Sequence, residues 1–521
     1  MKALHINGNE LTLEDVREVA LQRRPVLLEA EARQTVTRAR DVVEEVVAAD
    51  RLAYGVTTGV GKLSDLRIAP AQIVELQVNL LRSHAMGMGE PLSEAETRAI
   101  MLLRANSLAK GFSGVRPAVI DTLCEMLNRG VHPVVPSQGS VGASGDLAPL
   151  AHLGLALIGE GEAFFSASSR GKPRRAGDPS GRRMASAEAL RRAQIAPLKL
   201  EAKEAVSIIN GTQAMLAVGA LAMLAAEVMV DSADVIGALS VDALRGTDVA
   251  FDERIHKVRP HSGQVRSAEN VRRMLAGSQI RESHRDCGRV QDAYSLRCIP
   301  QVHGAVRDTL SHCRGVFEIE MNSAVDNPLV FASKNTTPEI LSGGNFHGEP
   351  LAFALDFLGI ALSALGSISE RRLERLVNPL LNEGLPPFLA PGAGLNSGFM
   401  MAQVTAAALV SENKVLAHPA SVDSITTSGN KEDYVSMGMT AAIKLKRILE
   451  NTRNVLAIEA IAAAQALDFL APLTPGKRAQ AAHAAIRAAS AKVEHDRALS
   501  GDFTQVAEVI AKGKLAEILS S

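Results

Sequence analysis

The stretch VPSQGSVGASGDLAPLAHLGLALIGEGEA, residues 135–163, joins a run of small residues to an apolar segment with helical character. Asp146 stands where that helix would begin, and an aspartate at such a position is a plausible N-cap. The plainest interpretation of the small residues is a tight turn before the helix. A serine-hydrolase elbow requires G-x-S-x-G, which the stretch misses by one residue. A phosphate loop requires a Lys-Ser/Thr ending, which is missing here.

Ala143-Ser144-Gly145 within this stretch also permits a reaction of the backbone itself. If the loop is bent tightly, the amide nitrogen of Gly145 can attack the carbonyl carbon of Ala143, because glycine has no side chain to block the approach. Loss of water closes a five-membered ring, and loss of a second water from Ser144 leaves a conjugated methylene group. Such a group is a strong electrophile. The sequence leaves both the turn and the ring open.

Helical patterns dominate the rest of the chain. The segment LSEAETRAIMLLRANSLAKG, residues 92–111, opens with Ser93 and Glu96 in capping-box spacing and ends on Gly111. Aromatic residues make up only 3% of the chain, so the core must consist mainly of aliphatic side chains, which suits helices. The sequence therefore predicts a mainly α protein, with further helices at 212–239, 305–322, 349–384, 399–416, 437–470 and 478–497.

The composition is that of a soluble globular protein, with 46% hydrophobic residues, 22% charged residues and a net charge of -1. This balance argues against nucleic acid or a membrane surface as a partner. The basic stretch 166–186 is interpreted as a solvated surface insertion, because the chain offers no matching basic face. The apolar runs 214–226 and 351–367 meet or contain acidic residues, so they indicate buried helices rather than membrane spans.

The four cysteines show neither a CxxC pair nor the compact spacing of a metal site. We therefore expect no disulfide framework and no metal ligands among them. The first twenty residues lack the apolar segment of a signal peptide. Both observations favour a cytoplasmic protein.

Eight separated blocks give the chain its family resemblance. Together they resemble the aromatic amino acid ammonia-lyase family, and within it the histidine-specific members, over roughly residues 5–500. The blocks are YGVTTGVGKL (54–63), NLLRSHAMGMGEPL (79–92), the opening stretch (135–163), LEAKEAVSIINGTQAM (200–215), VQDAYSLRCIPQVHG (290–304), MNSAVDNPLVF (321–331), SGGNFHGEP (342–350) and SENKVLAHPASVDSITTSGNKEDYVSMG (411–438).

The resemblance implies a fold, a prosthetic group and an assembly. The fold would be mainly α, of the ammonia-lyase and fumarase type, with an N-terminal domain over 1–200 and a long up-down helical bundle over 201–521. Ala143, Ser144 and Gly145 would cyclise to 4-methylidene-imidazol-5-one (MIO), and no external cofactor or metal would be needed. The family also implies a homotetramer whose active sites are shared among subunits, with a small amino acid as substrate.

Two of the three tyrosines receive catalytic roles from the resemblance. Tyr54 would be the base that removes the β-proton, Tyr294 would help to orient the amine, and Ser144 would supply the electrophilic carbon. A phenol is a weak acid, so Tyr54 would need electropositive surroundings, which the family provides by pointing helix N-termini at the MIO. From the residues alone, each tyrosine could also be a partly buried phenol with a hydrogen-bonded hydroxyl.

Further positions match the family's substrate-binding residues. Arg297, one helical turn after Tyr294, would bind the substrate carboxylate through its bidentate fork, and Asn327 would make a second contact. A surface ion pair and an ordinary Asn-Pro turn remain open for these two residues. Asn210 would bind the ring oxygen and the amine region, with a helix cap as its alternative. Gln291 and Phe346 would line the site, although simple packing would also explain Phe346.

Substrate choice depends on Ser83-His84 and on Glu432. These match the histidine-specific type, in which the acid contacts the imidazole of the substrate through a charge-assisted hydrogen bond. The expected reaction is deamination of L-histidine to trans-urocanate and ammonia. Lys431 and Tyr434 depart from the usual pattern, and a cation at 431 could pair with Glu432. An ammonia-lyase or aminomutase for phenylalanine or tyrosine therefore stays open, as does a non-catalytic helical scaffold without MIO.

Overall fold

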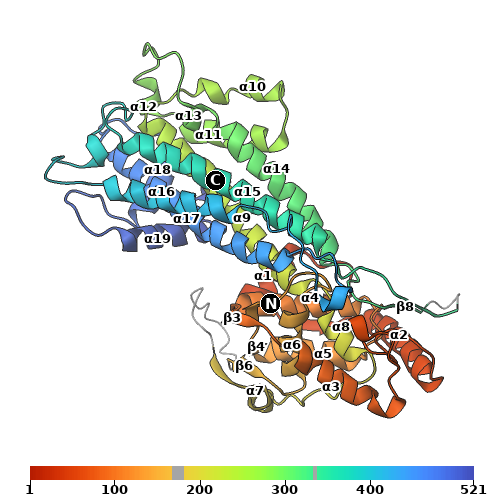
Figure 1. The fold of residues 1–521 in the computed structure, drawn as a ribbon. Helices are drawn as coiled ribbons and strands as arrows, with labels where there is room; N and C mark the ends of the chain where they lie inside the picture. The colour runs from red at the N-terminus through yellow and green to blue at the C-terminus, as the bar shows by residue number, and fades with distance from the viewer. Residues whose placement is uncertain (167–180, 333–336, 521) are drawn as a thin grey trace. The chain divides into compact units, whose positions relative to one another are not determined.

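The fold is described by a computed structural model that covers residues 1–166, 181–332 and 337–520 (Figure 1). Helices account for most of the described chain and the strands are short. The predicted mainly α class is confirmed. The chain divides into two compact units, and the first consists of Met1–Leu221, Arg314–Leu355 and Pro419–Ile443. The second consists of Ala222–Cys313, Asp356–His418 and Lys444–Ser521. The domain boundary expected near residue 200 stays a prediction.

The first unit combines helices with four small sheets. Its helices are α1 Leu13–Gln22, α2 Ala30–Ala48, α3 Ile73–His84, α4 Glu94–Ala109, α5 Pro117–Arg129, α6 Leu147–Leu157, α7 Ser186–Arg192 and α8 Glu204–Ile209. Its strands are β1 Leu4–Ile6, β2 Val26–Leu28, β3 Met88–Pro91, β4 Val131–Pro133, β5 Pro136–Gln138, β6 Glu162–Phe165, β7 Arg182–Ala185, β8 Leu329–Phe331 and β9 Glu339–Leu341. Three short 3-10 helices complete it, η1 Gly61–Leu63, η2 Pro70–Gln72 and η5 Ser428–Asn430.

The four sheets of this unit join segments that are distant in sequence. Strand β1 pairs in parallel with β2, while β3 pairs with β5, β4 with β6, β6 with β7 and β8 with β9, all antiparallel. The β3–β5 pair brings the segment after α3 beside the segment that leads into the opening loop, with Met88 opposite Gln138. Two candidate site segments are thereby fixed side by side.

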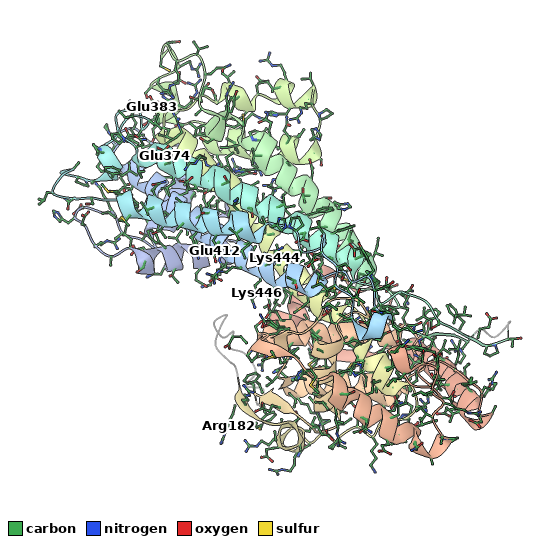
Figure 2. All side chains as sticks on the ribbon, viewed as in Figure 1. Arg182, Glu374, Glu383, Glu412, Lys444 and Lys446 are labelled. Carbon is green, nitrogen blue, oxygen red and sulfur yellow. The ribbon has the colours of Figure 1, made fainter. Side chains whose placement is uncertain are left out.

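Four long helices are divided between the units: α9 Gln213–Ala243, α14 Ile299–Glu320, α15 Glu349–Val377 and α17 Gly438–Asp468. The second unit adds α10 Glu253–Lys257, α11 Ser262–Leu275, α12 Gln279–Glu282, α13 Tyr294–Arg297, α16 Met400–Leu416, α18 Lys477–Arg487 and α19 Ser500–Ala511. Its 3-10 helices are η3 Val249–Phe251, η4 Pro387–Leu389 and η6 Ala516–Leu519. Charged side chains such as Glu374, Glu412 and Lys444 lie along α15, α16 and α17 (Figure 2).

The signals for the ends of α4 are confirmed. The Ser93 hydroxyl accepts from the backbone N–H of Glu96, the Glu96 carboxylate accepts from that of Ser93, and Gly111 has φ +82°. The predictions of helices at 349–384 and 478–497 extend too far. Helix α15 ends at Val377 because Pro379 disfavours helical geometry at Asn378, and α18 ends at Arg487.

The predicted surface insertion at 166–186 lies partly outside the described residues, which resume at 181. Its last part is not a loop. Residues Arg182–Ala185 form β7, paired with β6, and Ser186 is a buried residue at the start of α7. The sequence did not predict this strand because Arg182 and Arg183 are consecutive and both exposed, so they show no alternation. Arg182 extends away from the ribbon (Figure 2).

The buried core of the second unit contains ions as well as aliphatic side chains. Asp234 on α9 accepts hydrogen bonds from Ser267, Asn270 and Arg307 and lies 2.8 Å from His303 Nδ1. In the same unit, Arg372 on α15 donates from two nitrogens to Glu459 on α17, which also accepts from Ser240 and Ser369. Helices α9 and α15 have the length and hydropathy of membrane spans, but most of their apolar windows are buried within the protein.

Candidate active site

The loop at 139–146 is held by segments from two other parts of the first unit. The carbonyl of Gly142 accepts hydrogen bonds from the Gly348 N–H at 3.1 Å and the Ser436 hydroxyl at 3.0 Å. The carbonyl of Val141 accepts from the Met437 N–H at 2.8 Å. Ala143 is buried against Val435 and Met437. These contacts fix the loop on the N-terminal side of Ser144.

Gly145 cannot be replaced without disturbing the loop. Its φ is +68°, and a Cβ atom built there would lie 2.1 Å from the carbonyl oxygen of Gly211. The next residue donates its N–H to the same oxygen at 2.7 Å. The backbone of the loop thus lies directly on the turn that precedes α9, and only glycine fits.

Asp146 does not cap its own helix, so that prediction is wrong. Its carboxylate makes no capping bond to α6 and instead accepts from the N–H groups of Ala214 and Met215, at 2.9 and 2.8 Å, in the first turn of α9. The Ser140 hydroxyl donates to the other carboxylate oxygen at 2.8 Å. Burial raises the pKa of Asp146 to about 6, although these hydrogen bonds act to lower it. The acid fastens the loop to a neighbouring helix.

Four helices have their N-termini at this loop, within the first unit. Helix α6 follows it directly, and the N-terminus of α9 binds Asp146. Gly348, which precedes α15, and Met437, which precedes α17, donate their N–H groups to loop carbonyls. Helix N-termini carry partial positive charge, so their convergence makes the surroundings of Ser144 electropositive.

Ser144 contacts two of the predicted site residues. Its hydroxyl donates to Glu432 Oε1 at 2.9 Å, and its carbonyl accepts from Asn210 Nδ2 at 3.0 Å. The second oxygen of Glu432 accepts from the Thr427 hydroxyl at 2.8 Å. The side-chain oxygen of Asn210 is buried and has no hydrogen-bond partner among the described residues. It remains available to a donor such as an ammonium group.

Lys431 is exposed, and within the described chain it makes no ion pair with Glu432. The pairing considered from the sequence is therefore not seen. Tyr434 stacks on His347, with ring centroids 5.9 Å apart, so both departures from the usual pattern lie on the outer side of the segment. The carboxylate of Glu432 faces the loop.

Ser83 and His84 end helix α3. Nδ1 of His84 lies 2.9 Å from the carbonyl oxygen of Leu80 and 3.0 Å from the Ser83 hydroxyl. A carbonyl oxygen can only accept, so this nitrogen carries the hydrogen and Nε2 is left as an acceptor in the neutral ring. The chain after His84 packs beside the loop, since Gly87 donates its N–H to His152 of α6 at 3.1 Å.

Tyr54 lies half-buried in the glycine-rich segment before η1. Its hydroxyl oxygen accepts a hydrogen bond from the Gly61 N–H at 3.1 Å. The same segment reaches the region of Glu432, because a Cβ at Gly429 would lie 3.4 Å from the Lys62 side chain. This hydrogen bond fixes the position of the Tyr54 hydroxyl within the segment.

Asn327 and Phe346 belong to the same unit. The side-chain oxygen of Asn327 accepts from the Gly343 N–H at 2.7 Å and from the Ser342 hydroxyl at 3.1 Å. These bonds engage its side-chain oxygen, so a further contact to an acceptor would have to come from its amide nitrogen. Phe346, three residues after Gly343, is only partly buried.

Gln291, Tyr294 and Arg297 fall in the second unit, so the structure groups them with one another and not with the loop residues. Arg297 lies over the ring of Tyr294, 4.7 Å from its centroid, as expected for one face of a helical turn. Tyr294 is 72% exposed and is therefore not core filler. Gln291 is exposed as well.

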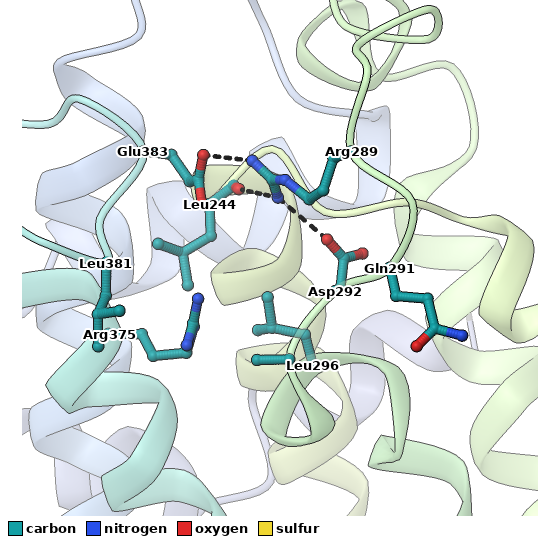
Figure 3. Close-up of a pocket in the computed structure, with 9 residues that line it drawn as sticks. Leu244, Arg289, Gln291, Asp292, Leu296, Arg375, Leu381 and Glu383 are labelled. Carbon is teal, nitrogen blue, oxygen red and sulfur yellow. Dashed lines mark hydrogen bonds and ion pairs between the residues drawn. The ribbon is translucent and has the colours of Figure 1, made fainter.

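A buried ion pair anchors the segment that leads to Tyr294 (Figure 3). Asp292 accepts from the Thr247 N–H at 2.6 Å and from Arg289 at 3.0 Å, and Arg289 also pairs with Glu383. These groups border a cavity of about 30 Å³, which is too small for an amino acid. Sequence reasoning missed Asp292, because the block shows an acid two residues before Tyr294 but not that it is buried.

Sequence reasoning also missed Thr427, which orients Glu432, and Arg104, which binds the Asn210 turn. Both lie inside or beside blocks that carry the family resemblance, but their partners are remote in sequence. Among the residues that the structure describes, no cluster of three or more His, Cys, Asp or Glu side chains could hold a metal ion.

Comparison with known proteins places this geometry in a family. The family model for aromatic amino acid lyase matches residues 11–488. A curated protein named histidine ammonia-lyase, from Koribacter versatilis (strain Ellin345), is 69% identical over 99% of both chains. A second of that name, from Anaeromyxobacter sp. (strain K), is 53% identical over 99% of this chain and 100% of its own.

Solved structures agree with this result. The crystal structure of histidine ammonia-lyase from Trypanosoma cruzi has a TM-score of 0.89 at 39% identity, covering 100% of this chain and 95% of that one. Tyrosine aminomutase from Streptomyces globisporus has a TM-score of 0.91 at 39% identity, covering 99% and 98%. The chain therefore belongs to the aromatic amino acid lyase family.

Proposed function

We propose that the protein is a carbon–nitrogen lyase that removes ammonia from L-histidine and releases trans-urocanate. The observation that carries the proposal is the contact between Ser144 and Glu432, whose hydroxyl and carboxylate oxygens lie 2.9 Å apart. It joins the residue that would supply the electrophile to an acid suited to bind an imidazole. The relatives named histidine ammonia-lyase, at 69% and 53% identity over nearly full length, support the same substrate.

The residues around the loop fit an MIO group. Ala143 is buried, Gly145 has the left-handed φ and close approach that ring closure needs, and Asn210 donates to the carbonyl that would become the ring oxygen. The MIO supplies an electrophile that makes the substrate amine a better leaving group. Four helix N-termini stabilise the negative charge that develops beside it.

Tyr54 is proposed as the base. A β-proton next to an unactivated carbon is barely acidic, so a positioned base and an electropositive site are both required. The Gly61 N–H donates to the Tyr54 oxygen at 3.1 Å and so fixes the position of the proposed base. Tyr294, on the exposed face of α13, is proposed to orient the amine and to handle protons.

The substrate would be held at its carboxylate and at its ring. Arg297 and Asn327 are proposed for the carboxylate, the first as a charged fork and the second through its amide nitrogen, since its oxygen already accepts from Gly343. Glu432, Ser83 and His84 are proposed for the imidazole, and Gln291 and Phe346 to line the site. The buried oxygen of Asn210 would accept from the substrate amine.

An aminomutase, or a lyase for tyrosine or phenylalanine, is the second candidate. The similarity to tyrosine aminomutase from Streptomyces globisporus, at 39% identity, favours testing it. Glu432 argues against it, because a phenol or phenyl ring cannot return two polar contacts as an imidazole can.

We propose a cytoplasmic homotetramer. All four cysteines of the chain are free, which fits a reducing compartment.

Within the second unit, an apolar groove of about 650 Å³ lies between α14 and α15, and Ile360 at its edge is 46% exposed. A second copy of the chain is the proposed occupant, since the family's sites combine residues from several subunits. Ile360→Glu should dissociate the tetramer in sedimentation, whereas Glu450→Gln on α17 should not.

Incubation of the purified protein with L-histidine, L-tyrosine and L-phenylalanine tests the reaction. Arylacrylate absorbance measures elimination, and chromatography of β-amino acids measures migration. We expect urocanate from histidine and little product from the other two. Intact mass should lack two water molecules, and Ser144→Ala should restore them and abolish activity. Absence of urocanate, or full activity of Ser144→Ala, would contradict the proposal, while a mass without the loss would indicate a non-catalytic scaffold.

A further inference from the structure

Arg104, in the middle of α4, is an arginine with no exposed surface. One guanidinium nitrogen, Nη1, donates to the carbonyl of Asn210 at 3.0 Å and to Gln213 Oε1 at 2.7 Å. The other two nitrogens, Nε and Nη2, are buried and have no hydrogen-bond partner among the described residues. Burial lowers the pKa of Arg104 to about 10, so the side chain is still charged at neutral pH.

Such a charge is a poor contribution to stability. A buried ion is normally compensated by an opposite charge, but Asp326, the acid whose charge acts on Arg104, is itself bonded to Lys203 at 3.0 Å. Unsatisfied buried donors add a further cost. Arg104 is thus better explained by its contacts with Asn210 and Gln213 than by a contribution to stability.

Arg104 holds the Asn210–Gly211 turn, on which the loop at 139–146 packs. A Cβ at Gly211 would lie 2.2 Å from Arg104 Nη1, and a Cβ at Gly145 would lie 2.1 Å from the Gly211 oxygen. The Arg104 guanidinium therefore packs directly on the backbone of Gly211, and Gly211 packs directly on the backbone of Gly145. Neither Gly211 nor the guanidinium can move without loosening the contact on Gly145.

The same arginine fixes a second contact to the loop. It binds the carbonyl of Asn210, whose side chain donates to the Ser144 carbonyl at 3.0 Å. Arg104 thereby sets the position of two neighbouring groups, the Asn210 amide and the Gly211 carbonyl. One contacts Ser144 and the other contacts Gly145.

Ring closure needs this kind of constraint. The Gly145 nitrogen forms a bond to the Ala143 carbonyl carbon, and its proton passes to the Ala143 oxygen. That hydroxyl leaves with the Ser144 amide proton as the first water, which creates a C=N bond. The Ser144 hydroxyl and Cα proton leave as the second water, which creates the exocyclic C=C bond. An amide is a weak nucleophile, so the first step depends on holding the two atoms in a near-attack geometry.

We propose that Arg104 is a positioning residue for this cyclisation, pressing the Asn210–Gly211 turn onto Ser144-Gly145 so that the backbone closes. The inference rests on the proposed MIO-dependent function. It assigns Arg104 to maturation of the protein and not to binding of the substrate.

The test compares two buried arginines of the same helix. Arg98 is also buried, but it donates to the carbonyls of Val19 and Leu127, away from the loop. Wild type, Arg104→Met and Arg98→Met are purified as folded protein, and their intact mass, circular dichroism and thermal unfolding are measured. We expect the full two-water loss in wild type and Arg98→Met but only a partial loss in Arg104→Met, because ring closure there should be roughly ten- to a hundredfold slower.

Each outcome has a distinct meaning. Complete ring formation in folded Arg104→Met, or an equal loss of the ring in Arg98→Met, would overturn the role of Arg104 and leave the proposed function intact. A wild-type chain without the two-water loss would overturn both. If Arg104→Met does not fold, Arg104→Lys replaces it, because lysine retains the charge but not the fork. Partial cyclisation at a slower rate would support the role, and wild-type cyclisation would overturn it.

Discussion

The ionic core of the second unit and the loop region of the first both bury polar groups, but they satisfy them differently. In the ionic core, Asp234 and Glu459 each receive three or more hydrogen bonds or ion pairs, and none of their polar atoms is left over among the described residues. Around the loop, Arg104 and Asn210 retain buried atoms without partners.

For these four residues, the difference separates two acids that hold the fold from two residues proposed to serve the reaction. An unsatisfied buried polar atom costs about 1–3 kcal/mol, so it persists where another use compensates for it. The Asn210 oxygen is placed for a substrate amine, and the Arg104 guanidinium for the turn behind Gly145. Variants of the ionic core should therefore lose stability, whereas variants of the loop region should lose activity or ring formation.

Gly145→Ala should produce the largest effect and should act on the reaction. A Cβ there would meet the Gly211 carbonyl at 2.1 Å, and φ is +68°, so the loop must shift and ring closure should fail. We expect deamination to fall to background and the intact mass to retain both waters. Gly277→Ala is the control, since φ there is +75° but the space is open. Loss of activity in that variant would refute a local cause.

Glu459→Gln should have the next largest effect, on stability. Removing one charge from the buried pair with Arg372 leaves the other uncompensated, which costs about 3–5 kcal/mol. The chain has no tryptophan, so circular dichroism during urea unfolding is the suitable measurement. Activity per folded molecule should be retained, and Glu508→Gln, on an exposed pair with Lys512, should change little. A comparable loss of stability in both variants would remove the contrast.

Glu432→Gln should have a smaller effect, confined to the substrate. Replacing the charged acceptor with an amide should lower kcat/KM for L-histidine roughly ten- to a hundredfold, because a charge-assisted hydrogen bond is lost. Lys431→Gln is the matched control, since Lys431 is the exposed neighbour. Equal losses in the two variants would show that Lys431 does act on Glu432.

The sequence predicts those parts of the fold that depend on neighbours in the chain. Helix α4 is marked at both ends by Ser93 and Gly111, and α9 and α17 by long apolar patterns. Pro379 also indicates where α15 ends, but the helical pattern continues beyond it, and the predicted helix was therefore extended to residue 384. Strands of three or four residues, such as β7, are too short to be recognised from an alternation of apolar and polar residues.

The candidate site could be predicted only through the resemblance. The contact between Ser144 and Glu432 spans 288 residues, and that between Ser144 and Asn210 spans 66. No local pattern encodes such contacts. Asp146 shows the limit clearly, because its position predicts a cap for α6 while the tertiary fold gives its carboxylate to α9.

The smallest predicted effect concerns acid, and its sign should differ between the two regions. Burial raises the pKa of Asp146 to about 6 from 3.8, so the folded state binds that proton more tightly than the unfolded state does. Its contribution to the unfolding free energy should therefore increase as pH falls from about 6 to about 4, by at most about 1.4 kcal/mol per pH unit. Burial would also raise the pKa of Asp234, but Arg307 and His303 hold it below its usual range, so the contribution of Asp234 to stability is lost only in stronger acid.

Urea unfolding of wild type and Asp146→Asn between about pH 7 and 4.5 isolates the contribution of Asp146 to the unfolding free energy. Intact mass must show the same ring content in both proteins. A difference in stability that stays constant with pH would mean that the Asp146 carboxyl keeps an ordinary pKa, and that burial at the loop does not make the folded state bind this proton more tightly.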